Sequence, residues 1–236
     1  MLGVLTALAG LVLPAECAGC RAADETLRRG ACARCAAELS ALRPVGARPD
    51  PAPPGLPACV AIGAYAGPLR EAILSYKERG RVGLAGPLGV LLADAVAAAA
   101  GGGPRPVLLI AIPSSARAAR ARHGDHMRRL TARATRRLRR AGWPVAVVRP
   151  LRALPKPDAT ELDAASRAIA ATASLRVRRT RATAVREAAR GRRVILVDDI
   201  LTTGATLAAA TAVLRAAGIP VDRAAVLAAT RRHHSR

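Results

Sequence analysis

Short apolar runs alternate with longer stretches of helical periodicity along most of this chain. The apolar runs predict strands at residues 59–65, 107–112, 145–149, 194–197 and 221–229. The helical pattern predicts helices at residues 68–79, 84–100, 125–141 and 205–217, while residues 151–190 are mixed and loop-rich. Strands that alternate with helices are typical of an α/β fold in which helices flank a parallel sheet.

The chain divides into two parts by composition. Residues 1–58 hold an apolar opening (1–13), a cysteine-rich segment and a stretch rich in Pro and Gly (43–58) that is typical of a linker. Residues 59–236 hold the predicted strands and helices and form the main domain. The 236 residues suffice for one sizeable domain with a small appendage. Its core must be aliphatic, because the aromatic side chains are Tyr65, Tyr76 and Trp143.

No membrane span is predicted from the pattern. The opening residues 1–13 are apolar but lack a basic region before them, and the apolar residues 90–100 are short and contain Asp94. We therefore expect a cytoplasmic protein in which residues 1–13 form a helix that packs on the main body. An atypical signal peptide is the alternative.

Positive charge is concentrated in the second half of the chain. The formal net charge is +22, and Lys77 and Lys156 are the only lysines among 38 basic residues. Residues 113–193 contain 22 basic residues against five acids, a net charge of +17. Such a block suits a polyanion, for example a pyrophosphate or single-stranded DNA, although a solvated helix face gives the same pattern. Because aromatic residues are nearly absent from it, contacts to nucleic acid would be mostly to the backbone and sensitive to salt.

Two CxxC pairs near the N-terminus predict a metal site. Cys17, Cys20, Cys32 and Cys35 are spaced as CxxC-x11-CxxC and offer four thiolates at tetrahedral reach, which is typical of a structural zinc ribbon. Two disulfides and a redox CxxC are the alternatives, and a cytosol disfavours disulfides. Cys59 stands apart and is expected to be a buried thiol.

The most informative segment is residues 194–206. Four apolar residues lead into Asp198 and Asp199, and the turn Thr202-Thr203-Gly204-Ala205-Thr206 then opens a helical pattern. A loop that opens a helix binds phosphate through free N–H groups and the helix dipole, and paired carboxylates suit the vicinal hydroxyls of a sugar. An ordinary strand followed by Asp and Thr helix caps is the alternative.

This segment resembles the phosphoribosyl pyrophosphate (PRPP) signature of type I phosphoribosyltransferases at every position. The resemblance implies that Asp198 and Asp199 hold the ribose hydroxyls and are the catalytic residues. It implies that the loop Thr202, Thr203, Gly204, Ala205 and Thr206 binds the 5′-phosphate, with magnesium accompanying PRPP. Gly204 would let the chain approach the phosphate without a Cβ in the way.

A cysteine segment ahead of a PRPP signature resembles the ComF family, proteins linked to bacterial competence and DNA uptake. Residues 65–71 with 76–80, and residues 112–113 with 117–126, are similar to further family segments. The resemblance implies that Arg122, Arg149 and Arg152 face or close over the pyrophosphate. The chain departs from the family pattern at Asp125, at Ala170 and in the acidic residues 158–161, so catalytic turnover is left open.

Three functions therefore compete. The first is a ComF-like protein that binds PRPP and magnesium and serves DNA uptake through its basic surface, together with other DNA-uptake proteins. The second is an active phosphoribosyltransferase in nucleotide salvage. The third is a PRPP-responsive regulator that binds nucleic acid.

Overall fold

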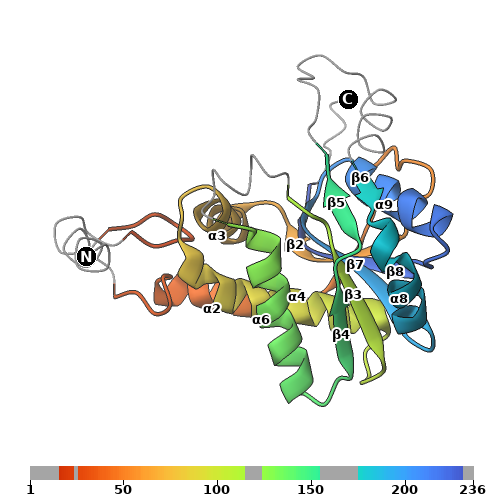
Figure 1. Cartoon of the computed structure of the whole chain (residues 1–236). Coiled ribbons are helices and arrows are strands. Elements are labelled where there is room, and N and C mark those ends of the chain that lie inside the picture. The colour runs from red at the N-terminus through yellow and green to blue at the C-terminus, as the bar shows by residue number, and fades with distance from the viewer. Residues whose placement is uncertain (1–15, 24–25, 115–123, 155–174, 231–236) are drawn as a thin grey trace, which may run out of the picture.

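The structure is a computed structural model, and it describes residues 16–23, 26–114, 124–154 and 175–230 (Figure 1). The predicted α/β architecture is confirmed: helices flank a mostly parallel sheet. The strands are β1 (Val45–Ala47), β2 (Ala58–Ala64), β3 (Val107–Ala111), β4 (Val145–Val148), β5 (Leu151–Ala153), β6 (Leu175–Val177), β7 (Arg193–Leu201) and β8 (Arg223–Ala229). The helices are α2 (Ala33–Ala41), α3 (Gly67–Lys77), the short 3-10 helix η1 (Val82–Leu84), α4 (Ala85–Ala100), α6 (His126–Arg140), α8 (Arg179–Ala189) and α9 (Ala205–Ala216).

The main sheet has the strand order β1-β2-β8-β7-β3-β4. Strand β1 is antiparallel to β2, and the other neighbours are parallel. From β3 the chain crosses through α6 to β4 on one side, whereas from β7 it crosses through α9 to β8 on the other. The crossovers change direction between β3 and β7, and ligands of open α/β sheets bind at the carboxyl ends of the strands at such a point.

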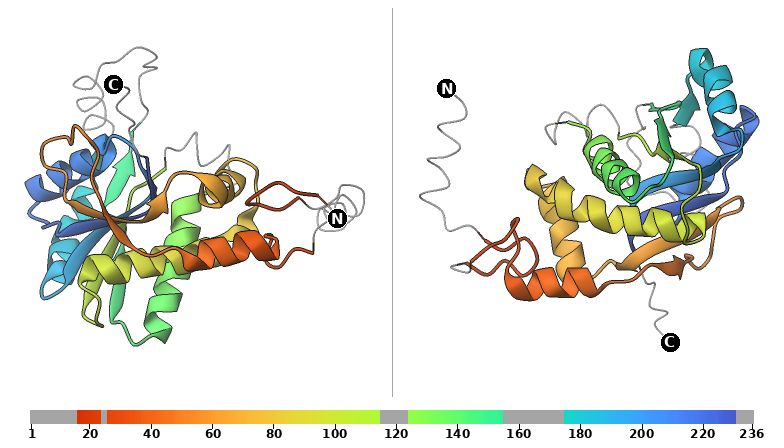
Figure 2. Two further views of the ribbon diagram at one scale, coloured as in Figure 1. Left: turned by 180° about the vertical axis from the view of Figure 1, so that it is seen from behind. Right: turned by 90° about the horizontal axis from the view of Figure 1, so that it is seen from below.

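Each face of the sheet is covered by its own helices, and a separate apolar cluster fills each interface. Residues of α3, α4 and α6 pack with Ile195 and Val197 of β7 on one face. Residues of α8 and α9 pack with Val194 and Leu196 on the opposite face. Figures 1 and 2 show the two helix layers with the sheet between them. The core is aliphatic as predicted, with Tyr76 and Trp143 its only buried aromatic side chains among the described residues.

Helix α4 lies in the core of the first face, where it packs closely on α6. Within the described ranges, one helical stretch, Val82–Ala100, is apolar and long enough to cross a membrane, with a mean hydropathy of 1.8. It packs against α6 and β8, and 56% of its most apolar 18-residue window is buried inside the fold. Gly89 permits the close approach, because a Cβ there would lie 2.4 Å from the Cβ of Arg133.

Several boundaries differ from those predicted. Strand β7 continues through the two acids to Leu201 instead of ending at residue 197. Three residues of the predicted linker form the edge strand β1, because the backbone of a Pro- and Gly-rich segment can still hydrogen-bond to the edge of a sheet. Helix α8 lies within a region expected to be loop-rich. It was missed because its sequence is mostly polar and shows little apolar periodicity, although it buries Val185 and Ala189. The helix predicted at residues 1–13 lies outside the described residues.

Candidate functional site

The two acids lie where β7 leaves its neighbour β3. The last β3–β7 pair joins Ala111 to Val197, and the next residue of that chain, Ile112, donates its N–H to the Val197 carbonyl at 3.0 Å. On its other side β7 still pairs with β8, with Asp198 opposite Val226. Asp198 and Asp199 therefore lie at the carboxyl end of the central strand, at the change of crossover direction where a ligand site is expected.

The two carboxylates differ in their surroundings. Successive side chains of a strand point to opposite faces, so Asp199 follows Ile195 and Val197 towards the α3 and α6 face. There its Oδ2 lies 2.8 Å from Lys77 Nζ and 3.0 Å from His126 Nε2, and the residue is 7% exposed. Asp198 is partly exposed, and its Oδ1 accepts the Asp199 N–H at 2.9 Å. Asp199 is thus held in an ion pair, whereas Asp198 is partly exposed.

His126 joins three segments of the site. Its Nδ1 lies 3.1 Å from Ser114 Oγ in the loop after β3, and its Nε2 contacts Asp199. The hydroxyl of Tyr76 donates to the His126 carbonyl at 2.7 Å, and the two rings meet edge to face with centroids 6.3 Å apart. The start of α6, the end of α3 and the acids of β7 are therefore fixed relative to one another.

The local charges move the two aspartate pKa values in opposite directions. Burial alone would raise the pKa of Asp199, but the hydrogen bond from His126 and the positive charge of Lys77 outweigh it and hold this pKa well below its usual range. Burial, and then the negative charge of Asp199, raise the pKa of Asp198 well above its usual range. A carboxylate in this state gains stability from a cation or a hydrogen-bond donor brought to it by a ligand.

The predicted phosphate loop leads into α9. Thr202, Thr203 and Thr206 are at least partly exposed, and α9 begins directly after Gly204. Gly204 has φ +76°, a conformation that favours glycine, and a Cβ there would come within 3.0 Å of the Leu56 side chain. Residues of the predicted linker thus pack against the loop on one side, which the sequence did not suggest. Ala205 donates its N–H to Thr203 Oγ1 at 3.4 Å, and the N-terminal end of α9 that follows favours an anion.

The arginines predicted to close over the pyrophosphate are not brought to the acids within the described residues. Arg149 follows β4 and lines a groove beside α6. Arg152 lies on the separate ribbon of β5 and β6, opposite Arg176. Arg122 lies outside the described residues. The roles of these three arginines remain predictions.

Lys77, His126 and Ser114 were not identified as site residues from the sequence. A signal for Lys77 was present, because it lies in the segment 76–80 that resembles the family and is one of two lysines among 38 basic residues. His126 lies in the segment 117–126 that resembles the family, and Ser114 directly follows residues 112–113, but their contacts in the site are seen only once α6 and the loop after β3 are placed beside β7.

The four cysteines converge as predicted. Their sulfur atoms all lie within 4.8 Å of one another, and Cys20 Sγ and Cys32 Sγ are 3.8 Å apart. Four sulfurs bound to zinc at about 2.3 Å would form a tetrahedron with edges of about 3.8 Å. Cys17 Sγ accepts the N–H groups of Cys32 at 3.2 Å and Gly19 at 3.4 Å. Burial would raise the pKa of Cys17, but these backbone donors lower it to about 6. No disulfide joins the cysteines, and their geometry is compatible with structural zinc.

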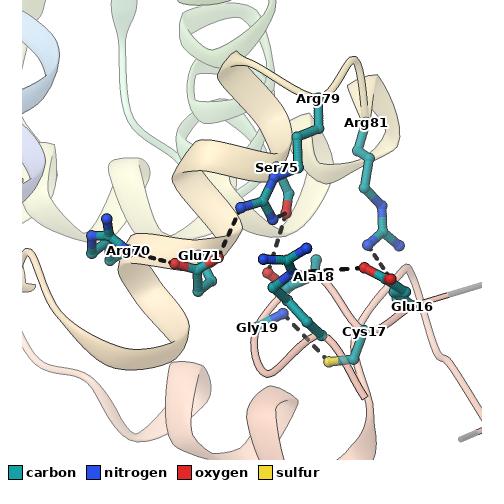
Figure 3. A network of polar contacts seen from close by, with 10 residues as sticks. Glu16, Cys17, Ala18, Gly19, Arg70, Glu71, Ser75, Arg79 and Arg81 are labelled. Atoms are coloured by element: carbon teal, nitrogen blue, oxygen red, sulfur yellow. Dashed lines mark hydrogen bonds and ion pairs between the residues drawn. The ribbon is translucent and has the colours of Figure 1, made fainter. Parts of the chain in front are cut away.

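The cysteine segment is docked on α3 and on the turn that follows it (Figure 3). Arg81 donates to the carbonyls of Glu16 at 2.6 Å and Gly30 at 3.2 Å, and Ser75 of α3 donates to the Ala18 carbonyl at 3.4 Å. Figure 2 shows this segment at the end of the molecule remote from α8 and α9. Because Lys77 is the last residue of α3, the cysteine segment supports the helix that positions this lysine.

Comparison with known proteins agrees with the site. Residues 151–236 match the family model described as phosphoribosyl transferase domain, a range that contains the acids and the loop before α9. This part of the chain is similar to a phosphoribosyltransferase domain. Thirty-eight residues are 55% identical to the adenine phosphoribosyltransferases of Mycobacterium avium (strain 104) and Mycolicibacterium paratuberculosis (strain ATCC BAA-968 / K-10). This match covers 16% of the chain, which spans about a fifth (21%) of the length of these relatives.

Proposed function

We propose that this chain binds PRPP with Mg²⁺ at the carboxyl end of β7, as a ComF-like protein of the phosphoribosyltransferase type. The observation that carries the proposal is the position of Asp198, partly exposed and directly ahead of a helix-opening loop at the change of crossover direction. The match of residues 151–236 to the phosphoribosyl transferase domain supports it.

The loop and the first turn of α9 bind the 5′-phosphate in this proposal. The N–H groups of that turn and the hydroxyls of Thr202, Thr203 and Thr206 are the donors, and the helix dipole favours the anion. Gly204 keeps the loop in the conformation that exposes these donors, because its positive φ is strained for other residues.

The ribose hydroxyls donate to the carboxylates. Asp198 is the direct acceptor, since Asp199 is already bound by Lys77 and His126. Asp199 orients the pair and keeps its negative charge beside the sugar, where positive charge develops at the anomeric carbon as pyrophosphate leaves. Lys77 and His126 keep Asp199 ionised, so that this negative charge is not lost by protonation.

The donor set fits magnesium, which binds through one or two carboxylates together with substrate phosphates. The partly exposed Asp198 is the residue that would hold the ion. When bound, Mg²⁺ would neutralise phosphate charge and favour departure of the pyrophosphate.

The biological role that we propose is support of competence-related DNA uptake in the cytoplasm. The cysteine cluster docked on α3 and the arginine-rich α6 support this role, because the first matches the ComF resemblance and the second offers a basic surface for single-stranded DNA. Binding to oligonucleotides over a salt series tests the nucleic-acid part. Absence of binding at low salt would rule out the proposed role in binding single-stranded DNA.

An active salvage transferase is the second candidate. The similarity to adenine phosphoribosyltransferases favours it, although the match is too short to identify an acceptor. Release of pyrophosphate from PRPP in the presence of purines, pyrimidines and amines tests this candidate, and no release with any acceptor would end it.

Calorimetric titration with Mg²⁺–PRPP tests the site itself. Asp198→Asn removes a charged acceptor worth about 1.5–3 kcal/mol, so affinity should fall roughly 10- to 150-fold. Asp222→Asn is the matched control, because Asp222 accepts the Val194 N–H at the opposite end of the same strand. Unchanged affinity in Asp198→Asn would show that the site is elsewhere.

A further inference from the structure

A groove runs between α6 and β4, at the edge of the sheet that lies away from β1. Its volume is 620 Å³. The polar residues that line it are Thr131, Thr135, Arg136, Arg139, Arg140 and Arg149. Among the described residues that line the groove, none is acidic and none is aromatic, so its polar groups are hydroxyls and guanidinium groups.

Two hydroxyls of residues that line this groove lie beneath its surface and have no hydrogen-bond partner within the described structure. Thr131 is 2% exposed and Thr135 is 5% exposed, and the Oγ1 atoms of both are buried without a partner within the described structure. A buried threonine in a helix ordinarily donates back to the carbonyl four residues earlier. Thr211 of α9 does so, donating to Leu207 at 2.8 Å. Thr131 and Thr135 have not taken this partner, and because their Oγ1 atoms are buried, each would reach an acceptor in the groove by rotating about χ1.

Four arginines of the described structure line the groove. Arg139 is fixed, because its Nε and Nη2 donate to the Val145 carbonyl at 3.1 and 2.7 Å. Arg136, Arg140 and Arg149 are exposed around it. Four guanidinium groups without an acid among them repel one another, and an anion with several oxygens relieves this repulsion.

We propose that the groove between α6 and β4 binds consecutive phosphate groups. Thr131 and Arg140 are nine residues apart, so the donors extend over about 14 Å of helix. One phosphate cannot reach both ends, whereas a chain of phosphates can. Arginine and hydroxyl donors together match phosphate oxygens, and the absence of an aromatic lining residue leaves bases no surface on which to stack.

Such a phosphate chain could be free or belong to a nucleic-acid strand, and two probes separate these sources. Binding of tripolyphosphate and of a short oligothymidylate is measured by calorimetry at low salt. Binding of the oligonucleotide alone identifies a strand, and binding of tripolyphosphate identifies a free chain. The proposal is independent of the PRPP site, so Asp198→Asn should leave this affinity unchanged. If neither probe binds, the proposal is wrong.

The double variant Thr131→Val/Thr135→Val tests the hydroxyls without changing their shape. Without ligand its melting temperature should rise, because two unpaired buried groups are removed. Affinity for the bound probe should fall about fivefold or more for each lost hydrogen bond. Thr211→Val is the control, because it removes a bonded hydroxyl outside the groove, so it should lower stability and leave the affinity unchanged.

The double variant Arg136→Gln/Arg140→Gln tests the charges. For a single strand, removing two phosphate contacts should reduce the slope of log affinity against log salt by about 1.4. Arg215→Gln, on α9 at the opposite face, should leave probe affinity unchanged. Full affinity in the threonine double variant, or a fall in its melting temperature, would overturn the proposal.

Discussion

Breaking the contact between Lys77 and Asp199 is expected to lower the free energy of unfolding of the ligand-free protein. Lys77 Nζ and Asp199 Oδ2 are 2.8 Å apart, and their side chains are 21% and 10% exposed. Lys77→Met keeps the length of the side chain and removes its charge. Among the described residues, Asp199 then keeps one side-chain partner, His126, where it had two, and it stays buried.

The size of the effect follows from the distance and the burial. At 2.8 Å and an effective dielectric constant of about 20, the attraction is about 6 kcal/mol. Desolvation of both groups cancels part of it, and His126 retains one contact, so Lys77→Met should lower the free energy of unfolding by about 2–4 kcal/mol. Asp199→Asn should cost about 1–2 kcal/mol, because Lys77 can reach solvent and an amide can still contact His126.

Urea unfolding of the wild type, both single variants and the double variant gives the coupling energy. We expect about 2 kcal/mol, since each single change already breaks the pair and the double change adds little. The pair Glu71 and Arg79 is the control: its atoms are 3.1 Å apart, but Arg79 is 39% exposed. Glu71→Gln and Arg79→Met should therefore show a coupling within about 0.2–1 kcal/mol.

The pH of the measurement follows from the lowered pKa of Asp199. A carboxyl group whose pKa is lower in the folded state contributes stability that is present above its unfolded pKa of about 4 and lost as the pH falls through the folded value. The cycle should therefore be measured at neutral pH. A coupling no larger than that of the Glu71 control would refute the ion pair. Asp199 would then be free to accept a hydrogen bond from the ribose, as Asp198 is.

The remaining predictions concern packing and metal. Gly89→Ala should destabilise the protein by about 1–3 kcal/mol, because its Cβ would lie 2.4 Å from the Cβ of Arg133. Gly86→Ala in the same helix meets no atom within 4 Å and should stabilise by up to about 1 kcal/mol, and thermal unfolding compares the two. Cys17→Ser should reduce zinc content measured by metal analysis and lower the melting temperature, whereas Cys59→Ser should leave the zinc content unchanged; equal zinc in both would contradict the site.

The strand and helix pattern was largely predictable, because apolar periodicity reports which side chains face the core. The end of β7 was predicted too early for the same reason. Asp198 interrupts the apolar run, yet its backbone still pairs with β8 opposite Val226. Backbone pairing does not depend on side-chain polarity, so strand length escapes a pattern built on hydrophobicity. The three residues of β1 were missed likewise, since they gain order from the edge of β2 and not from their own composition.

The candidate site was predictable only where it is contiguous in sequence. Asp198, Asp199 and the loop before α9 form one motif, and the four cysteines form another. The contacts of Asp199 join residues 77, 126 and 199, and no local spacing relates these positions. Nor could spacing show that Leu56 packs against Gly204, because the contact arises from the route of the chain after β1.

The cysteine segment and the acids are linked through α3, and this connection gives the cysteine cluster a role beyond its own stability. Ser75 of α3 donates to the Ala18 carbonyl of the cysteine segment. Two residues later the helix ends at Lys77, which forms the ion pair with Asp199. Tyr76 lies between them and holds the first residue of α6. Loss of zinc should therefore loosen the end of α3, and Lys77 with it, so that chelation lowers PRPP affinity without touching a ligand-binding residue. Full PRPP affinity in the zinc-free, still folded protein would show that the two sites are independent.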